Sequence, residues 1–345
     1  MIRNPGYEYE QIWLPASEQL MEWGKDFHNV LLGDELRMTA FHAAIDDVVR
    51  PGSTVLDLGT GTGILAEWAL RAGAQAVYAI ELNKSLLDVA VTRIKATGFT
   101  DRFHPICGLS FDVEIPTAVD AIISETMGNI ADNEGFVEIL KDARRRFLSA
   151  GGVVIPCRVE SYLVPVEAER AHAHIRHASP HGGISKEEFA RQLSRRKAKS
   201  LFDFYYDAII PAACHLSQPK LVRRYEFKED ETGTYTVPLI YTVDRSGLLT
   251  GFKGYFIATL SRTVTLDISG DDIEGGTTSD SWKHCYLPLE NPCPVLAGDH
   301  IKLIFTRSQL VGETHPFRQS YCWKGSVISG GETVSQFSQK TTSAP

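Results

Sequence analysis

Up to about residue 150, the chain alternates short apolar runs with segments whose apolar positions recur at helical spacing. A stripe of this kind over residues 1–48 predicts amphipathic helices. The apolar runs predict strands at 54–58, 76–81, 103–107 and 120–124, and the spaced stripes predict helices at 64–72, 85–97 and 137–147. Strands that alternate with helices of this length indicate an α/β fold with a Rossmann-like, doubly wound parallel sheet. A Gly151-Gly152 pair predicts the turn that ends this region.

After residue 157 the pattern changes to strand-length alternations separated by turns rich in Gly, Asp and Pro. It predicts strands at 159–166, 221–227, 234–243, 251–260, 264–268, 284–289, 300–305 and 321–328. A mostly antiparallel β-barrel or β-sandwich domain therefore follows the Rossmann-like one. A charged segment over 167–205 predicts a helical insertion, whose basic run is a solvated helix face, a dimerisation arm or a substrate lid. Residues 331–345, rich in Ser, Thr and Gln, predict a flexible tail.

The length of the chain favours more than one domain, because 345 residues exceed the usual size of a single compact core. The two patterns place a Rossmann-like domain at 49–157 and a β domain at 158–330, with N-terminal helices over 1–48 before them. These boundaries separate the candidate cofactor site in the first domain from candidate substrate contacts in the second.

Composition narrows the classes of function. The chain has 43% apolar and 23% charged residues, a formal net charge of −8 and a pI near 5.8, which argues against nucleic-acid and anionic-membrane partners and suits basic ligands. Its six cysteines form no C-x-x-C pair for zinc or redox work, so we expect free thiols, no metal and a cytoplasmic location. We see no signal peptide, and no apolar run approaches the ~18 residues that a membrane span needs.

A glycine-rich turn follows the first strand of the Rossmann-like domain. It reads Asp57-Leu58-Gly59-Thr60-Gly61-Thr62-Gly63, which differs from the G-x-G-x-x-G fingerprint of dinucleotide sites. Glu81 ends the next strand, where an acid can accept hydrogen bonds from two ribose hydroxyls; the alternative is a solvated residue at a strand end. A ribose site without a pyrophosphate site points to S-adenosylmethionine as the cofactor.

Two glutamates, Glu125 and Glu134, flank a Met127-Gly128 turn directly after the strand 120–124. Ligands of a parallel sheet collect at the carboxyl ends of its strands, so we expect both acids beside the cofactor. A pair of carboxylates there can grip a planar guanidinium through charge-assisted hydrogen bonds and offset its repulsion from a sulfonium. Two structural alternatives remain: Glu125 pairs with a core arginine, and Glu134 stabilises a helix N-terminus.

These residues resemble the protein arginine methyltransferase family over about residues 25–330. The marks are the turn Val55–Gly63, Glu81, and Ser124-Glu125-x-Met127-Gly128 with Glu134, which is similar to the double-glutamate loop of the family. The resemblance implies that Glu125 and Glu134 are the catalytic acids. It also implies donor contacts from Asp57, Gly59, Gly61 and Glu81.

The resemblance extends beyond the sheet. His28-x-x-x-Leu32-x-Asp34-x-x-Arg37 is similar to the N-terminal helix that caps the donor, with Arg37 at the methionyl carboxylate and His28 over the cofactor. The acid that meets the adenine amine in the family falls near Ser110-Phe111, where neither residue is acidic, and Ser110 is the expected contact. Met127, Ser281 and Trp282, together with the two glutamates, are then the expected substrate-binding residues, and a homodimer is the expected assembly.

The chain departs from the family pattern in ways that affect the substrate. Its acceptor loop reads Asp280-Ser281-Trp282, with Ser281 where the family has histidine, and an aromatic Tyr-Phe-x-x-Tyr element before the capping helix is missing. The altered loop and the lack of a low-complexity targeting region favour an N-methyltransferase of free L-arginine or a small guanidino metabolite. The alternatives are a protein arginine N-methyltransferase, a methyltransferase of another nucleophile such as a hydroxyl or carboxylate, and an inactive interaction scaffold.

Overall fold

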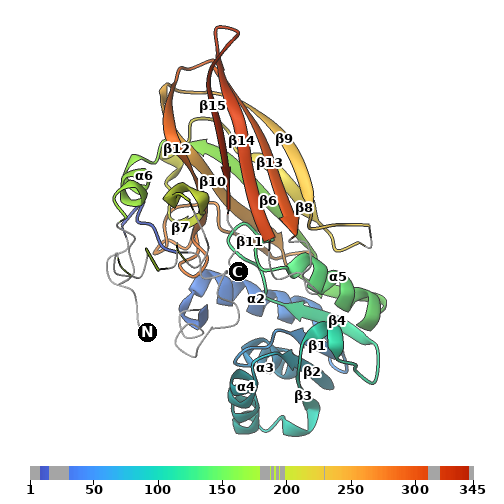
Figure 1. The fold of residues 1–345 in the computed structure, drawn as a ribbon. Helices are drawn as coiled ribbons and strands as arrows, with labels where there is room; N and C mark the ends of the chain where they lie inside the picture. Colours follow the sequence, from blue (N-terminus) through green and yellow to red (C-terminus); the bar gives the residue numbers. More distant parts are fainter. Residues whose placement is uncertain are drawn as a thin grey trace.

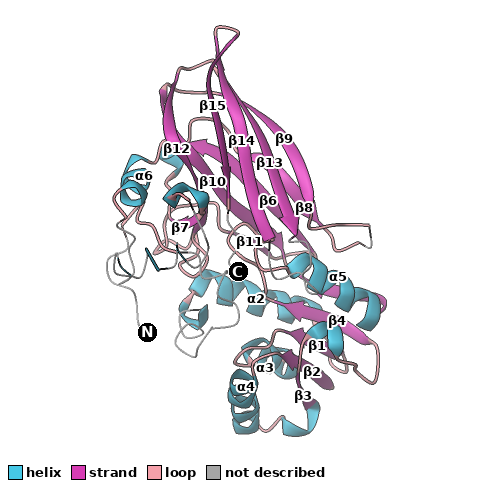
Figure 2. Ribbon diagram, in the orientation of Figure 1, coloured by secondary structure: helices cyan, strands magenta, loops and turns pink. Residues whose placement is uncertain are grey.

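The computed structural model describes residues 8–14, 31–178, 187, 190, 191, 194, 199–228, 230–309 and 319–341. Within these residues it has a parallel sheet with helices at one end of the molecule and long antiparallel strands at the other (Figure 1, Figure 2). None of the described helices is long and apolar enough to cross a membrane. The candidate site lies where the two parts meet.

The first part is a five-stranded parallel sheet in the order β3-β2-β1-β4-β5. Its strands are β1 (Thr54–Leu58), β2 (Ala76–Glu81), β3 (Phe103–Cys107), β4 (Val119–Ser124) and β5 (Leu148–Ile155). Its helices are α2 (Glu35–Val48), α3 (Ile64–Arg71), α4 (Lys84–Thr97) and α5 (Phe136–Phe147), with short 3-10 helices η2 (Thr100–Arg102) and η3 (Ser110–Asp112). Every residue of β1 is buried, as an unbroken apolar run in a sheet covered on both faces requires. The predicted Rossmann-like domain is confirmed.

The second part is a β-sandwich. Its larger sheet has the order β7-β12-β10-β6-β8, with β11 paired to β10, and its smaller sheet has the order β15-β14-β13-β9. The larger sheet contains β6 (Arg158–Val166), β7 (Tyr206–Ala208), β8 (Lys220–Tyr225), β10 (Gly247–Thr259), β11 (Thr265–Asp267) and β12 (His284–Val295). The smaller sheet contains β9 (Tyr235–Thr242), β13 (His300–Gln309), β14 (Gln319–Ser329) and β15 (Glu332–Lys340). Of the two predicted forms, the sandwich is the correct one, because the described strands form two separate sheets rather than one closed barrel.

Three local predictions need correction or qualification. The Gly151-Gly152 pair does not end the region in a turn but lies within β5, opposite an irregularity in its pairing with β4. The expected flexible tail contains β15, whose alternate residues Phe337 and Gln339 are buried although its composition is polar. In the expected helical insertion, α6 (Glu169–Arg176) and the 3-10 helix η4 (Leu201–Asp203) are described; a further 3-10 helix, η5 (Ala212–Cys214), follows β7.

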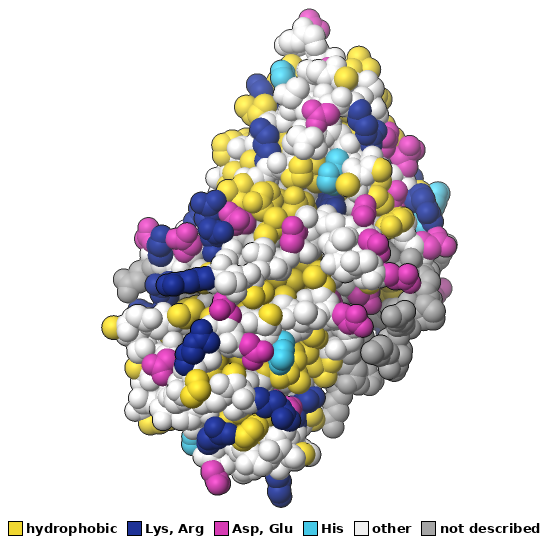
Figure 3. All heavy atoms as spheres, turned by 180° about the vertical axis from the view of Figure 1, so that it is seen from behind, with side chains coloured by type: hydrophobic (Ala, Val, Ile, Leu, Met, Phe, Trp, Pro, Cys, Tyr) yellow, Lys and Arg dark blue, Asp and Glu magenta, His cyan; other side chains and the backbone are white. Residues whose placement is uncertain are grey.

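The surface carries charges of both signs. On the face seen from behind, acidic and basic side chains are interspersed with hydrophobic and polar ones (Figure 3). All six cysteines are free thiols. This face therefore does not present the one-sided positive field that is typical of a nucleic-acid-binding surface.

Candidate active site

The candidate site lies at the carboxyl ends of β1, β2 and β4. Leu58, the last residue of β1, is paired with Ile80 of β2 on one side and Ser124 of β4 on the other. The glycine turn, Glu81 and Glu125 follow these strand ends, so the register brings them to one edge of the sheet. The strand order also reverses between β1 and β4, which is where α/β folds bind their ligands.

The glycine turn is tightly packed, and its glycines are needed. Gly59, Gly61 and Gly63 have φ angles of 75°, 53° and 80°, in the left-handed region that residues with a side chain rarely adopt. A Cβ atom on Gly63 would lie 2.8 Å from the Cβ of Ala90, and one on Gly59 would lie 3.1 Å from Cγ2 of Thr126. The turn thus leaves its backbone close to the loop that carries Glu125.

Two carboxylates line this turn. Asp57 is fully buried, and one of its oxygens accepts a hydrogen bond from the Thr60 hydroxyl at 2.5 Å. Burial raises the pKa of Asp57 to about 7, and the nearby Glu81 carboxylate adds to the effect. A buried carboxylate at a glycine turn fits a site for a cationic or hydroxyl-bearing cofactor.

Glu81 is held in place by backbone amides. Its Oε2 accepts from the Gly61 amide at 3.0 Å, and its Oε1 accepts from the Asn83 amide at 2.8 Å. Burial raises its pKa. Each carboxylate oxygen has a second lone pair, so the orientation fixed by these amides still allows bonds from ribose hydroxyls.

The predicted catalytic acids meet a buried arginine. Glu125 forms an ion pair with Arg37 of α2, as one of the structural alternatives expected. The Arg37 guanidinium also lies 5.1 Å from the centre of the Trp282 ring. Burial lowers the pKa of Arg37 to about 10, against the opposing charges of Asp34 and Glu134. The cluster therefore already holds one guanidinium group between acids and an aromatic face.

Glu134 is 9% exposed. Burial raises its pKa to about 8; Arg37 acts in the opposite direction, and Asp207 adds to the rise. A carboxyl group with this pKa is poised between its two protonation states near neutral pH. A second cation placed beside it would favour the ionised form.

The predicted acceptor loop packs against the double-glutamate loop and against the start of α2. The Trp282 indole N–H donates to the Met127 carbonyl at 2.6 Å, which joins this loop to the double-glutamate loop. Ser281 donates to Asp34 Oδ2 from its amide at 3.0 Å and from its hydroxyl at 2.7 Å. The hydroxyl of Ser279 donates to the same oxygen. The serine that stands in the histidine position thus anchors the acceptor loop to the start of α2.

The structure brings most of the predicted site residues together at this edge. They are Arg37, Asp57, Gly59, Gly61, Glu81, Glu125, Met127, Glu134, Ser281 and Trp282. Ser110 lies in η3, three residues after Cys107, which pairs with Glu81 in the sheet. The Ser110 carbonyl accepts a hydrogen bond from the Arg146 side chain at 2.9 Å. His28 lies outside the described residues.

Sequence reasoning gave no role to two acids of this cluster, Asp34 and Asp207. Asp34 accepts the Arg37 amide at 3.1 Å as the N-cap of α2, in addition to its bonds from the acceptor loop. An aspartate directly before an amphipathic stripe is an N-cap signal that could have identified it. Asp207 of β7 accepts from the Asn129 side chain at 2.7 Å and adds negative charge near Glu134. No pattern in the sequence places it there. The described residues contain no group of three or more side chains that could hold a metal ion.

Two family models match the chain. Residues 55–152 match the model described as a methyltransferase domain, and residues 158–315 match the one described as the PRMT5 oligomerisation domain. The chain is 26% identical over 307 residues to protein arginine N-methyltransferase PRMT10 of Oryza sativa subsp. japonica, covering 80% of this chain and 79% of that protein. It is 27% identical over 286 residues to ribosomal protein arginine N-methyltransferase rmt3 of Schizosaccharomyces pombe, covering 78% of this chain and half, 50%, of that relative's length.

Solved structures show the same fold. Protein arginine methyltransferase 10 of Arabidopsis thaliana, in an open conformation, superimposes with a TM-score of 0.76 at 23% identity, covering 91% of this chain and 96% of that one. The PRMT1 enzyme–prozyme heterotetramer of Trypanosoma brucei, solved with AdoHcy, gives a TM-score of 0.74 at 19% identity with the same coverage.

Proposed function

Because the chain belongs to the protein arginine methyltransferase family, we propose that it methylates a guanidino nitrogen of arginine residues in proteins. S-adenosylmethionine is the cofactor, and it supplies an electrophilic methyl group on a sulfonium. The single observation that carries the proposal is the cluster of Glu125 and Glu134 around a buried guanidinium at the carboxyl end of β4.

The two acids act on the substrate through charge. A guanidinium keeps its proton at any physiological pH, and its nitrogen lone pairs are delocalised. Carboxylates at Glu125 and Glu134 hold the planar group and draw positive charge onto the nitrogens that do not react. Their negative charge also offsets the repulsion between two cations brought close together. Once the methyl group is transferred, an ionised Glu134 can accept the released proton.

Other residues hold the donor. Glu81 is oriented by the Gly61 and Asn83 amides to accept ribose hydroxyls, and the buried Asp57 carboxylate is bonded to Thr60 of the same turn. Arg37 would bind a carboxylate of the donor, and its ion pair with Glu125 would weaken as a result. This exchange would leave Glu125 available for the substrate guanidinium.

Protein arginine is a better-supported substrate than free arginine. The similar proteins are named protein arginine N-methyltransferases, in rice, fission yeast and Arabidopsis thaliana. One of the two sequence arguments for a small substrate was the altered acceptor loop with Ser281, but this serine is bonded to Asp34. Its identity therefore reports how the loop is anchored, and it gives no reason to prefer a small acceptor.

Mass spectrometry can test the substrate directly. We expect the full chain with S-adenosylmethionine to add 14-Da increments to arginine in an arginine-rich peptide, and to leave free L-arginine and the corresponding lysine-rich peptide unmodified. A mock preparation from cells that lack the chain is the control for contaminating activity. Methylation of free arginine alone would refute the protein-substrate proposal and restore the small-molecule alternative. No methylation of either would refute the guanidino reaction.

Two further properties are part of the proposal. Self-association, with a homodimer as the expected form, is supported by the match of residues 158–315 to an oligomerisation-domain family. Sedimentation equilibrium would test it. A cytoplasmic location is supported by six free thiols, which suit a reducing compartment. Fractionation of cells that express the chain would test the location.

A further inference from the structure

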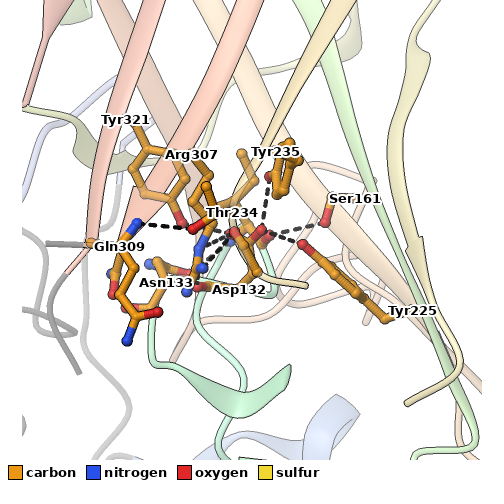
Figure 4. A network of polar contacts seen from close by, with 12 residues as sticks. Asp132, Asn133, Ser161, Tyr225, Thr234, Tyr235, Arg307, Gln309 and Tyr321 are labelled. Carbon is orange, nitrogen blue, oxygen red and sulfur yellow. Dashed lines mark hydrogen bonds and ion pairs between the residues drawn. The ribbon is translucent and has the colours of Figure 1, made fainter. Parts of the chain in front are cut away.

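Asp132 lies in the loop between Glu125 and Glu134 and has no exposed surface. Side chains from four strands or strand ends of the β-sandwich converge on it (Figure 4). They are Tyr225 at the end of β8, Tyr235 at the start of β9, Arg307 of β13 and Tyr321 of β14. The loop of the methyltransferase domain is thus anchored in the other domain.

The three tyrosines all donate to the Asp132 carboxylate. The hydroxyls of Tyr225 and Tyr235 lie 2.6 and 2.7 Å from Oδ2, and that of Tyr321 lies 2.6 Å from Oδ1. Burial and the negative charge of Asp132 raise the pKa of each tyrosine well above its usual value. The hydroxyls therefore remain protonated, and each can keep its hydrogen bond.

Arg307 supplies the countercharge and a second attachment. Its Nε donates to the Asp132 carbonyl at 3.0 Å and lies 3.7 Å from Oδ1 of the same residue. Its Nη1 donates to the Gly233 carbonyl at 2.6 Å and lies 3.5 Å from Oε1 of Glu138, in the first turn of α5. Burial disfavours the charged form of Arg307, but the negative charges of Asp132 and Glu138 outweigh this effect and raise the pKa of Arg307. The same side chain thus contacts both sides of Glu134: the loop before it and the helix after it.

The rest of the loop is equally constrained. The side chain of Asn133 accepts from the Ile130 amide at 3.3 Å and donates to Asn129 Oδ1 at 3.1 Å, and its backbone carbonyl accepts from Gln319 of β14 at 2.5 Å. A Cβ atom on Gly128 would overlap the Asn133 side chain. Little freedom is left between Asp132 and Glu134, so a shift of Asp132 must move Glu134.

We propose that Asp132 is a positioning residue, through which the β-sandwich fixes Glu134 in the geometry that binds the guanidinium. The role rests on the proposed function, because it assumes that Glu134 grips the substrate. It makes the activity of the first domain depend on contacts from the second. Cofactor binding at the glycine turn, which Asp132 does not touch, is independent of it.

A matched pair of variants on one strand tests the role. Tyr235→Phe removes a hydroxyl bonded to Asp132, and Tyr241→Phe removes a buried hydroxyl of β9 that donates to the Leu163 carbonyl at 2.9 Å, away from the loop. We expect Tyr235→Phe to lower kcat on an arginine peptide at least fivefold, and Asp132→Asn at least tenfold. Tyr241→Phe should keep kcat within twofold of wild type. All three should keep the dissociation constant of S-adenosylmethionine, measured by calorimetry, within threefold.

Hydrogen exchange supplies a readout that needs no catalysis. In Tyr235→Phe, amides of the loop 126–134 should exchange at least tenfold faster than in wild type, and in Tyr241→Phe they should not change. Equal kcat values for the two tyrosine variants, with equal loop exchange, would overturn the positioning role. If Asp132→Asn does not fold, the tyrosine pair decides. If wild type methylates no arginine, the proposed function fails, while the exchange comparison still decides whether Asp132 holds the loop.

Discussion

Glu134→Gln gives the sharpest test of the catalytic cluster. Glutamine keeps the shape of the side chain and one oxygen acceptor but cannot carry the negative charge. Glu134 is 9% exposed, so little water is present to replace the lost charge. Arg37 and the substrate guanidinium would then share Glu125 as the remaining carboxylate of the pair.

The size of the effect follows from the kind of bond that is lost. A hydrogen bond to a charged group contributes about 1.5–3 kcal/mol, whereas a neutral one contributes about 0.5–1.5 kcal/mol. Glutamine replaces the charged bond by a neutral one, so the loss in the transition state is the difference, about 1–1.5 kcal/mol. Because 1.36 kcal/mol corresponds to a factor of ten, kcat should fall by roughly 5- to 13-fold. Affinity for S-adenosylmethionine should change little, since Glu81 and the glycine turn hold the donor.

The pH profile supplies a second signature. Burial raises the pKa of Glu134 to about 8 in the free protein, and the carboxyl group is protonated below this value and ionised above it. If the ionised form binds guanidinium, kcat/KM of wild type should rise about tenfold per pH unit up to pH ~8 and then level off. The kcat/KM of the Glu134→Gln variant should not show this rise with pH.

The assay is transfer of a labelled methyl group to an arginine peptide between pH 6 and 9. Glu160→Gln is the matched control, because Glu160 is a partly buried glutamate of β6 paired with Arg224 outside the site. The control should keep both the rate and the pH profile of wild type. A Glu134→Gln variant with wild-type kcat and an unchanged rise of kcat/KM up to pH ~8 would refute the assigned role of this carboxylate.

Three other substitutions test the remaining parts of the site. Glu125→Gln should lower kcat by about the same factor. Because the two acids act as one clamp, the double variant with Glu134→Gln should have a kcat little lower than that of the poorer single variant. A double variant whose loss of kcat equals the product of the two single losses would contradict this. Arg37→Lys should weaken donor binding at least ~10-fold in calorimetry, since an ammonium cannot form a bidentate pair while stacking on Trp282; wild-type affinity would reduce Arg37 to a structural role. Glu81→Ala should cost about 1–3 kcal/mol of donor affinity by calorimetry, and an unchanged value would mean that the donor binds elsewhere.

The sequence revealed strands wherever burial shaped their composition. β1 is buried at every residue and β6 at most of them, so their apolar runs matched the structure closely. β15 escaped notice because its first residues are exposed and one of its buried residues is the polar Gln339. β5 was hidden by Gly151-Gly152, where a Cβ atom on Gly152 would press against Leu148 and the Asp120 carbonyl. In the structure the two glycines allow irregular pairing between β5 and β4, whereas two consecutive glycines in a sequence usually indicate a turn.

The site was predictable to the extent that strand ends defined it. Glu125 and Glu81 follow parallel strands, and parallel strands bring their carboxyl ends to one edge. The contacts of Asp132 could not be found in this way, because its tyrosine partners lie 93, 103 and 189 residues away. Each tyrosine taken alone is an ordinary aromatic residue of a strand. Only the docking of the sandwich onto the loop gives them a common acceptor.

The raised pKa of Glu134 also has a consequence for stability. The unfolded chain has the ordinary glutamate pKa of 4.5, and the folded chain has one of about 8, so the folded state binds the proton more tightly between these values. The stabilising contribution of the protonated side chain is therefore fully present below pH ~4.5 and is lost as the pH rises through ~8. Glu134→Gln, which cannot ionise, should melt at a higher temperature than wild type at pH 8–9, with a smaller difference near pH 5. The substitution that lowers activity should thus stabilise the fold at pH 8–9, as expected when a buried charge is kept for catalysis.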